Sequence, residues 1–173
     1  MTSVPIYKYS RIDEMTWYVW DGAEFDFVRA HGHEPVEASH RVVVMSVGGV
    51  VVQRVAFESD VVVTVHYFDV ENVDEAVAWH KEAYPTARGN VWGVFKESGS
   101  YQFREGISIA QDSILRRSEH VDAKGDLISE AWFSMDSGDL LEMKGYEYGD
   151  DGELSATLLY GRDGALIDRY EEE

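Results

Sequence analysis

Residues 41–70 read RVVVMSVGGVVVQRVAFESDVVVTVHYFDV, and this stretch decides the fold. β-branched side chains dominate it, and their restricted χ1 angles suit a pleated strand better than a helix. Gly48-Gly49 separates two valine runs and is typical of a two-residue hairpin turn that needs positive φ. Because the runs at 42–44, 50–52 and 61–63 are apolar at consecutive positions, we expect both faces of these strands to be covered, as in the middle of a sheet.

The chain has 173 residues, 45% of them hydrophobic and 13% aromatic, which fits one folded domain over 1–173 with a sizeable core. No run approaches the roughly 18 apolar residues that a membrane-spanning helix needs. The first five residues, MTSVP, lack the basic and apolar regions of a signal peptide. Cysteine is absent, which excludes disulfides, thiolate nucleophiles and Cys-ligated zinc. By default these features favour a cytoplasmic protein.

Acidic residues dominate the charge: 33 Asp and Glu against 15 Lys and Arg give a net charge of −18. The excess is uneven, since residues 118–173 hold 16 acids and 4 bases (−12), whereas residues 1–117 hold 17 and 11 (−6). This charge argues against nucleic acid or an anionic membrane as a partner and favours a basic protein. Solubility or a salt-rich host is the alternative explanation for an acidic chain with only 5 lysines.

Two further patterns flank the valine strands. Asp21-Gly22 lies between the alternating runs 16–20 and 23–28 and predicts another hairpin. After Val70 the period changes, because apolar residues from 72 to 84 recur at helical spacing. Asn72 can cap this helix and Pro85 prevents its continuation, so we expect one helix over 72–84 across the sheet. We also expect three core residues: Val51, Val63 and Val77.

The C-terminal third repeats a short turn unit. Gly125, Gly138, Gly152 and Gly164 recur at spacings of 13, 14 and 12, each with an aspartate shortly before it and a leucine two residues after it. Aspartate accepts turn hydrogen bonds, glycine takes positive φ, and leucine restarts the buried face. The repeat predicts an antiparallel meander of strands within residues 114–170.

These elements predict an α+β fold that is mainly β. We expect a strongly bent antiparallel sheet with one principal helix and a C-terminal β-meander, and a barrel-like closure of the sheet as the alternative form.

The segment Tyr146-Glu-Tyr148-Gly-Asp150-Asp-Gly152-Glu-Leu154 resembles the tyrosine–aspartate (YD) repeats of Rhs-type proteins. It also resembles the short hairpin repeats of bacterial immunity and antitoxin-like proteins. The resemblance covers the C-terminal third of the chain and consists mostly of turn residues. It implies a context in bacterial toxin–immunity systems, without implying a catalytic site.

The segment His31-Gly-His33-Glu-Pro-Val-Glu37 is the candidate metal cluster. Two imidazoles at i and i+2 with a nearby carboxylate can ligate zinc, manganese or iron. The spacing resembles the His-x-His-x3-Glu core of cupins, which implies a metal site at His31, His33 and Glu37. The alternative is a solvated polar loop, in a protein for which we expect no metal and no cofactor.

The sequence favours binding over catalysis, because no serine lies on a Gly-x-Ser-x-Gly elbow and no Gly-rich phosphate loop is present. We expect an acidic immunity- or antitoxin-type protein that neutralises a basic toxin enzyme by direct binding. The first alternative is a ligand-holding or enzymatic β-barrel. The second is a DNA mimic that presents spaced carboxylates to a DNA-binding protein.

The predicted contact surface lies on the meander. Tyr146 and Tyr148 share a face with Glu142 by the period of two, while Leu141 and Met143 point the other way. Tyrosines beside carboxylates suit a protein interface, since they supply aromatic anchors and charges that steer the partner. The predicted partner-binding residues are Glu142, Tyr146, Tyr148, Asp150, Asp151 and Glu153.

Overall fold

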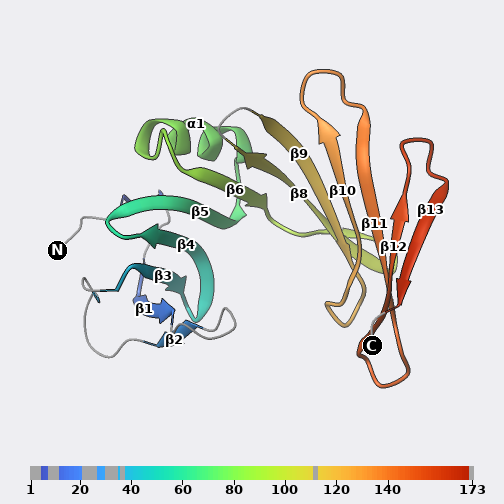
Figure 1. Ribbon diagram of the computed structural model, residues 1–173, viewed down its shortest axis with the longest axis horizontal. Coiled ribbons are helices and arrows are strands. Elements are labelled where there is room, and N and C mark those ends of the chain that lie inside the picture. The colour runs from blue at the N-terminus through green and yellow to red at the C-terminus, as the bar shows by residue number, and fades with distance from the viewer. Residues whose placement is uncertain are drawn as a thin grey trace. The chain divides into compact units, whose positions relative to one another are not determined.

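Figure 1 shows the computed structural model, which describes residues 5–7, 12–20, 27–29, 35, 38–110 and 113–171. The chain divides into two compact units. Residues 1–92 with 109–112 form the first unit, and residues 93–108 with 113–173 form the second. The single domain expected over 1–173 stays a prediction.

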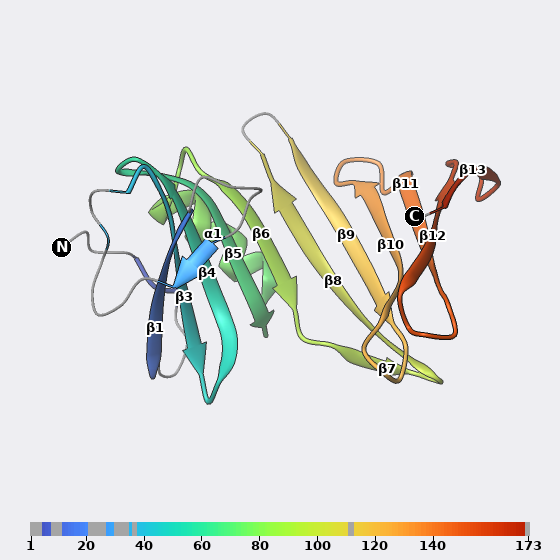
Figure 2. The same cartoon turned by 60° about the horizontal axis from the view of Figure 1, so that its bottom comes forward.

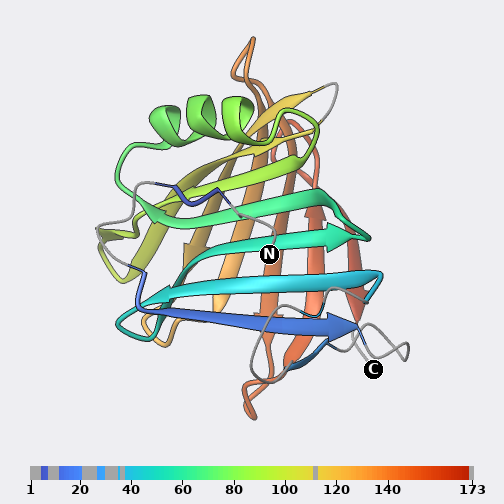
Figure 3. The same ribbon diagram turned by 90° about the vertical axis from the view of Figure 1, so that its left-hand side faces the viewer.

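The first unit is a sheet with one helix. Its strands are β1 (Glu14–Trp20), β2 (Phe27–Arg29), β3 (His40–Val47), β4 (Val50–Glu58), β5 (Val61–Val70) and β6 (Arg88–Gly93). They lie in the order β6-β5-β4-β3-β1-β2, and the pairs from β5 to β2 are antiparallel. Helix α1 (Val73–Ala83) packs against β5 (Figure 3).

The register of β3, β4 and β5 builds the core in rows. Val43 lies opposite Val55, which lies opposite Val65, and all three side chains are fully buried. Opposed residues of antiparallel strands share a face, so each row adds to one continuous buried surface. The next row, which is also fully buried, consists of Met45, Gln53 and Tyr67.

The hairpins of the valine strands are confirmed. Gly48 and Gly49 join β3 to β4 with φ of 58° and 82°, and Ser59 turns β4 into β5 with φ of 54° (Figure 2). Glycine adopts this left-handed region without a steric penalty, which explains why the pair sits between two valine runs.

The valine runs are covered less completely than predicted. Val43 is buried, but Val50, Val51 and Val61 are 55%, 39% and 60% exposed. The expectation that Val51 belongs to the core is therefore wrong, and Val63 and Val77 are half-buried. The three exposed valines lie next to the two turns, where the end of a strand has fewer neighbours to cover it.

The predicted helix over 72–84 is confirmed, with its two end residues acting as caps. The Asn72 side chain accepts a hydrogen bond from the Glu75 amide at 3.1 Å, and the Tyr84 amide donates to the His80 carbonyl at 2.8 Å. Pro85 then follows, where a further helical turn would lack an amide donor.

His80 links the helix to the sheet through hydrogen bonds. Its imidazole is 1% exposed, with Nδ1 lying 2.9 Å from the Tyr67 hydroxyl and Nε2 lying 3.1 Å from the Ala87 carbonyl. A carbonyl can only accept, so Nε2 carries the proton and Nδ1 accepts from the Tyr67 hydroxyl. The neutral ring thus satisfies both of its nitrogens without water.

The first hairpin differs from the prediction. β1 and β2 pair antiparallel as expected, but Trp20 lies opposite Phe27, whereas a two-residue Asp21-Gly22 turn would place it opposite Ala23. The connection therefore spans residues 21–26, which lie outside the described part of the chain.

The second unit is the predicted meander with two additional strands before it. Its strands are β7 (Lys96–Ser98), β8 (Tyr101–Ile109), β9 (Ile114–Val121), β10 (Leu127–Ser134), β11 (Leu140–Tyr148), β12 (Leu154–Tyr160) and β13 (Leu166–Glu171). They follow the order β13-β12-β11-β10-β9-β8, and β7 pairs with β8. Each strand from β9 to β12 pairs antiparallel with the next one along the chain.

The four repeated turns share one design. Gly125, Gly138, Gly152 and Gly164 all have φ between 73° and 94°. Aspartate carboxylates accept turn amides in three of these turns. In the turn at Gly138 the Ser137 hydroxyl accepts from the Asp139 amide instead, at 3.3 Å, so serine replaces the predicted aspartate.

The α+β, mainly antiparallel β fold with one helix and a C-terminal meander is confirmed for the described residues. The strand order is open, because β13 pairs only with β12 and β2 pairs only with β1 among the described strands. The barrel-like alternative therefore does not hold. No helix in the described part of the chain is long and apolar enough to cross a membrane.

We predict that His80 makes stability depend on pH. Burial lowers the pKa of His80 below its ordinary value of 6.5, so under acid conditions the unfolded chain binds a proton that the folded chain rejects. The free energy of unfolding should therefore fall as the pH drops below about 6.5, and His80→Gln should flatten this fall. Urea denaturation between neutral and mildly acid pH measures both slopes.

His40→Gln is the comparison variant, because it makes the same substitution at a histidine whose side chain is 42% exposed. Equal slopes for the wild type and His80→Gln would show that His80 does not set the pH dependence.

Candidate functional site

One face of the second unit's sheet carries a cluster of charged residues. Glu130 lies opposite both Glu119 and Lys144, and Trp132 lies opposite both Arg117 and Glu142. Opposed residues share a face, so β9, β10 and β11 present these groups together. We call this the charged face: Arg104, Arg117, Glu119, Glu130, Trp132, Glu142, Lys144 and Tyr146.

The charges at the centre of this face are paired. Arg104 lies 2.7 Å from Glu119, and Arg117 lies 3.4 Å from Glu130. These four side chains are only 13–18% exposed, so solvent screens their ion pairs less than it screens pairs on an open surface. The Tyr146 hydroxyl adds a hydrogen bond to the Glu130 carboxylate.

Trp132 contacts two of the neighbouring cations. The Arg117 guanidinium and the Lys144 ammonium each lie 5.2 Å from its ring centre, within the range of a cation–π interaction. Lys144 also pairs with Glu142 at 3.4 Å. These eight residues therefore include three cations and three carboxylates and together contribute no net charge.

The two predicted contact tyrosines are half-buried and hydrogen-bonded. Burial and the Glu130 carboxylate raise the pKa of Tyr146. The Tyr148 hydroxyl donates to the Leu127 carbonyl at 2.9 Å, and burial with nearby Asp126 and Asp122 raises the pKa of Tyr148. Both rings are neutral at physiological pH, and both hold neighbouring strands together.

The structure spreads the predicted contact residues along β11. Glu142 and Tyr146 share a face as expected, and Met143 lies opposite Ala131 on the other face. From Glu142 to Tyr148 the strand covers about 20 Å, at roughly 3.3 Å per residue. Glu142 is therefore separate from Asp150, Asp151 and Glu153, which lie in the β11–β12 turn.

Two turns lie at the same end of the sheet. The start of β10 lies beside the end of β11, because the Tyr148 hydroxyl bonds to the Leu127 carbonyl, so the β9–β10 turn neighbours the β11–β12 turn (Figure 1). Residues 122–126 and 149–153 contain five acids and one base, Lys124, for a net charge of −4. We call this the acidic end: Asp122, Asp126, Asp150, Asp151 and Glu153.

Turn hydrogen bonds order the acidic end. The amides of Asp126 and Lys124 donate to the Asp122 carboxylate at 3.0 and 2.8 Å and lower its pKa. The Glu153 amide donates to the Asp151 carboxylate at 3.1 Å. The opposite end of the meander is less acidic, since residues 135–139 and 161–165 hold three acids and one base, a net of −2.

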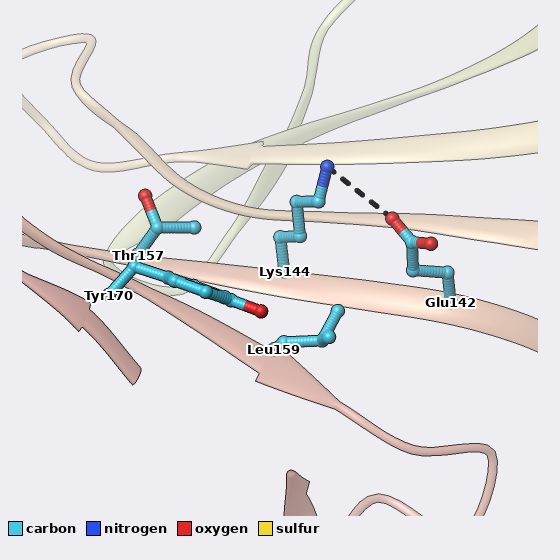
Figure 4. A pocket seen from close by; sticks show the side chains of 5 residues that line it. All are labelled: Glu142, Lys144, Thr157, Leu159 and Tyr170. Carbon is cyan, nitrogen blue, oxygen red and sulfur yellow. Dashed lines mark ion pairs between the residues drawn. The ribbon is translucent and has the colours of Figure 1, made fainter. Parts of the chain in front are cut away.

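A shallow pocket of about 430 Å³ opens on the charged face across β11, β12 and β13 (Figure 4). Lys144 lies opposite Leu159, and Thr157 lies opposite both Tyr146 and Tyr170. Figure 4 shows the Lys144–Glu142 ion pair on one side and the Tyr170 ring on the other. The pocket thus combines an apolar side chain, an aromatic wall and a carboxylate that a basic side chain can approach.

The predicted metal cluster at His31, His33 and Glu37 lies outside the described residues. Within the described ranges no three His, Asp or Glu side chains are arranged to hold a metal ion.

Several residues of the charged face were not predicted as site residues. The period of two places Glu130 and Trp132 on one face of β10, which is a usable signal. Their partners Arg104, Arg117 and Glu119 come from other strands, and only the observed register brings them alongside.

Comparison with protein-family models, curated proteins and solved structures finds no match to this chain. The resemblance to YD repeats stays a prediction from the sequence.

We predict that Tyr146 stabilises the sheet through its hydroxyl. Tyr146→Phe removes the donor to Glu130 and leaves a partly buried carboxylate with one bond fewer, which should lower the free energy of unfolding by about 1–2 kcal/mol. Urea denaturation at neutral pH measures the change.

Tyr148→Phe is the matched control. Its hydroxyl donates to a neutral carbonyl, and a hydrogen bond to a neutral acceptor is weaker than one to a carboxylate. The loss should therefore be smaller than for Tyr146→Phe, and the reverse order would show that Glu130 does not depend on Tyr146.

Proposed function

We propose that this chain is an acidic binding protein of the immunity or antitoxin type, which neutralises a basic toxin enzyme in the cytoplasm by direct contact. The observation that carries the proposal is the placement of the excess negative charge. The charged face is balanced, three cations against three carboxylates, while the acidic end has a net charge of −4 over ten residues.

The acidic end is suited to attract a basic surface. All five of its acids belong to turns, and Asp150, Asp151 and Glu153 are exposed. The ordered turns fix where these charges stand, so the field has a defined direction. Complementary charge accelerates encounter with a basic partner and disfavours acidic competitors.

The scaffold behind the acidic end supports a contact surface. Tyr148 bonds across to β10, so it holds the two acidic turns side by side. A surface whose side chains are already ordered loses little conformational entropy when a partner binds. Tyr148, Asp150, Asp151 and Glu153 therefore form the centre of the proposed contact, with Glu142 and Tyr146 along the adjoining strand.

A charge-reversal pair tests this placement. The partner is first captured from the organism that encodes the chain, and its association rate is then measured with Asp150→Lys/Glu153→Lys. These two positions spare the Asp151 turn bond. We expect association at least about tenfold slower than wild type at low salt, with the difference shrinking at high salt.

Asp136→Lys/Asp139→Lys is the matched control, because it changes the net charge equally in the turn at the other end of the sheet. It should slow association much less. Equal slowing by both variants would assign the effect to total charge. A captured DNA-binding protein that DNA displaces would instead favour a DNA mimic, and a partner whose activity persists in the complex would contradict neutralisation.

A further inference from the structure

Strand β13 is an open edge of the second unit's sheet. It pairs with β12 on one side, and no described strand pairs with the other side. All six of its residues are exposed, including Leu166, Ile167 and Tyr170 at 54%, 65% and 52%. An exposed edge of this kind is a template for another strand.

The backbone of β13 is oriented for such pairing. The Arg169 amide donates to the Asp168 carboxylate at 2.8 Å, so this N–H points away from β12. In an antiparallel strand the N–H and C=O of one residue point to the same side, and residues two apart repeat that direction. Arg169 and Glu171 therefore present backbone groups at the open edge, and the register with β12 is regular from Asp168 to Glu171.

A second copy of this chain is a poor occupant. In a symmetric antiparallel pair of β13 strands one residue must face its own counterpart. The two registers with the greatest overlap place Asp168 against Asp168 or Arg169 against Arg169, and like charges directly opposed are destabilising. Each chain also carries a net charge of −18, which opposes self-association.

We propose that β13 binds an extended basic segment of the protein partner by antiparallel strand addition. This inference rests on the proposed function, because the basic partner is the one that the acidic chain attracts. Backbone hydrogen bonds to Arg169 and Glu171 hold the added strand, as in other cases of strand addition to a sheet edge.

The side chains around β13 select a basic strand. Asp168 and Tyr170 lie opposite Leu159 and Thr157, so they stand on the same face as the pocket in Figure 4. Alternate side chains of an added strand extend along that face, where a lysine or arginine meets the Asp168 carboxylate and the exposed Tyr170 ring. Arg169 points to the other face, where Glu147 and Glu171 pair with it at 2.7 and 2.6 Å.

Asp168 has a second role as a removable cap of the edge. Its carboxylate accepts a hydrogen bond from the Arg169 N–H when no strand is bound. A basic side chain beside Asp168 draws the carboxylate away, and the N–H then becomes available to a carbonyl of the added strand. The Asp168 carboxylate therefore blocks pairing with neutral or acidic strands, and only a basic strand displaces it from the N–H.

The test uses a blocked peptide of alternating lysine and valine as the probe. A second peptide with the same sequence carries N-methyl groups on alternate backbone amides, which keeps its charge and removes its pairing edge. We expect the first peptide to bind and to protect the Arg169 and Glu171 amides from hydrogen exchange. The N-methylated peptide should bind about tenfold more weakly or worse.

The protein variants are Arg169→Pro and Arg169→Gln, which change the charge equally. Proline removes the outward N–H and is tolerated on the open side of an edge strand, whereas glutamine retains the N–H. Arg169→Pro should lose peptide binding while circular dichroism shows an intact sheet, and Arg169→Gln should bind. Equal binding by both variants, or by both peptides, would overturn strand addition.

Two outcomes separate this inference from the proposed function. If the captured partner binds Arg169→Pro normally but is lost with Asp150→Lys/Glu153→Lys, the acidic contact stands and the edge inference fails. If the protein dimerises in sedimentation and Arg169→Pro makes it monomeric, the occupant of β13 is a second copy, and the proposal of a basic segment is wrong.

Discussion

The pairing register set by the positive-φ glycine turns is the constraint on which the second unit depends. Gly125, Gly138, Gly152 and Gly164 each reverse the chain after a strand of seven to nine residues. A shift of one residue in any pair would move every side chain of that strand to the other face. The same register that places Glu130 between Glu119 and Lys144 therefore also gives Tyr146 its carboxylate partner.

The acids of this unit have two different roles, which their position decides. On the charged face, Glu119, Glu130 and Glu142 each lie beside a cation, which neutralises their charge within the sheet. In the turns, Asp122 and Asp151 accept backbone amides, which satisfies the turn and leaves the negative charge directed at solvent. The same carboxylates thus order the turns and carry the charge on which the proposed attraction of a basic partner depends.

The edge strand extends this division of roles. Arg169 is neutralised by Glu147 and Glu171 on one face, while Asp168 on the other face covers the open backbone donor. Charged residues on edge strands protect a sheet against indiscriminate pairing. In a chain of net charge −18, the strand addition that we propose at this edge would favour a basic segment for the same electrostatic reason as the proposed contact at the acidic end.

The sequence by itself determined the local structure. Turn chemistry and periodicity act over a few residues, and they predict the Gly48-Gly49 turn, the helix from its Asn72 cap to Tyr84 and the five-strand meander.

The same reasoning misplaced the connection after Trp20 and the burial of Val51, since those depend on pairing partners and neighbours. The contact surface predicted at Glu142, Tyr146, Tyr148, Asp150, Asp151 and Glu153 extends along β11 into the turn that follows it, and its role in binding stays a prediction. Only the tertiary structure decided that the Tyr148 hydroxyl bonds to the Leu127 carbonyl on β10 and that Arg117 and Lys144 flank Trp132. The reason is physical: these contacts join residues on different strands, and their distances are set by register, which no single segment of the sequence contains.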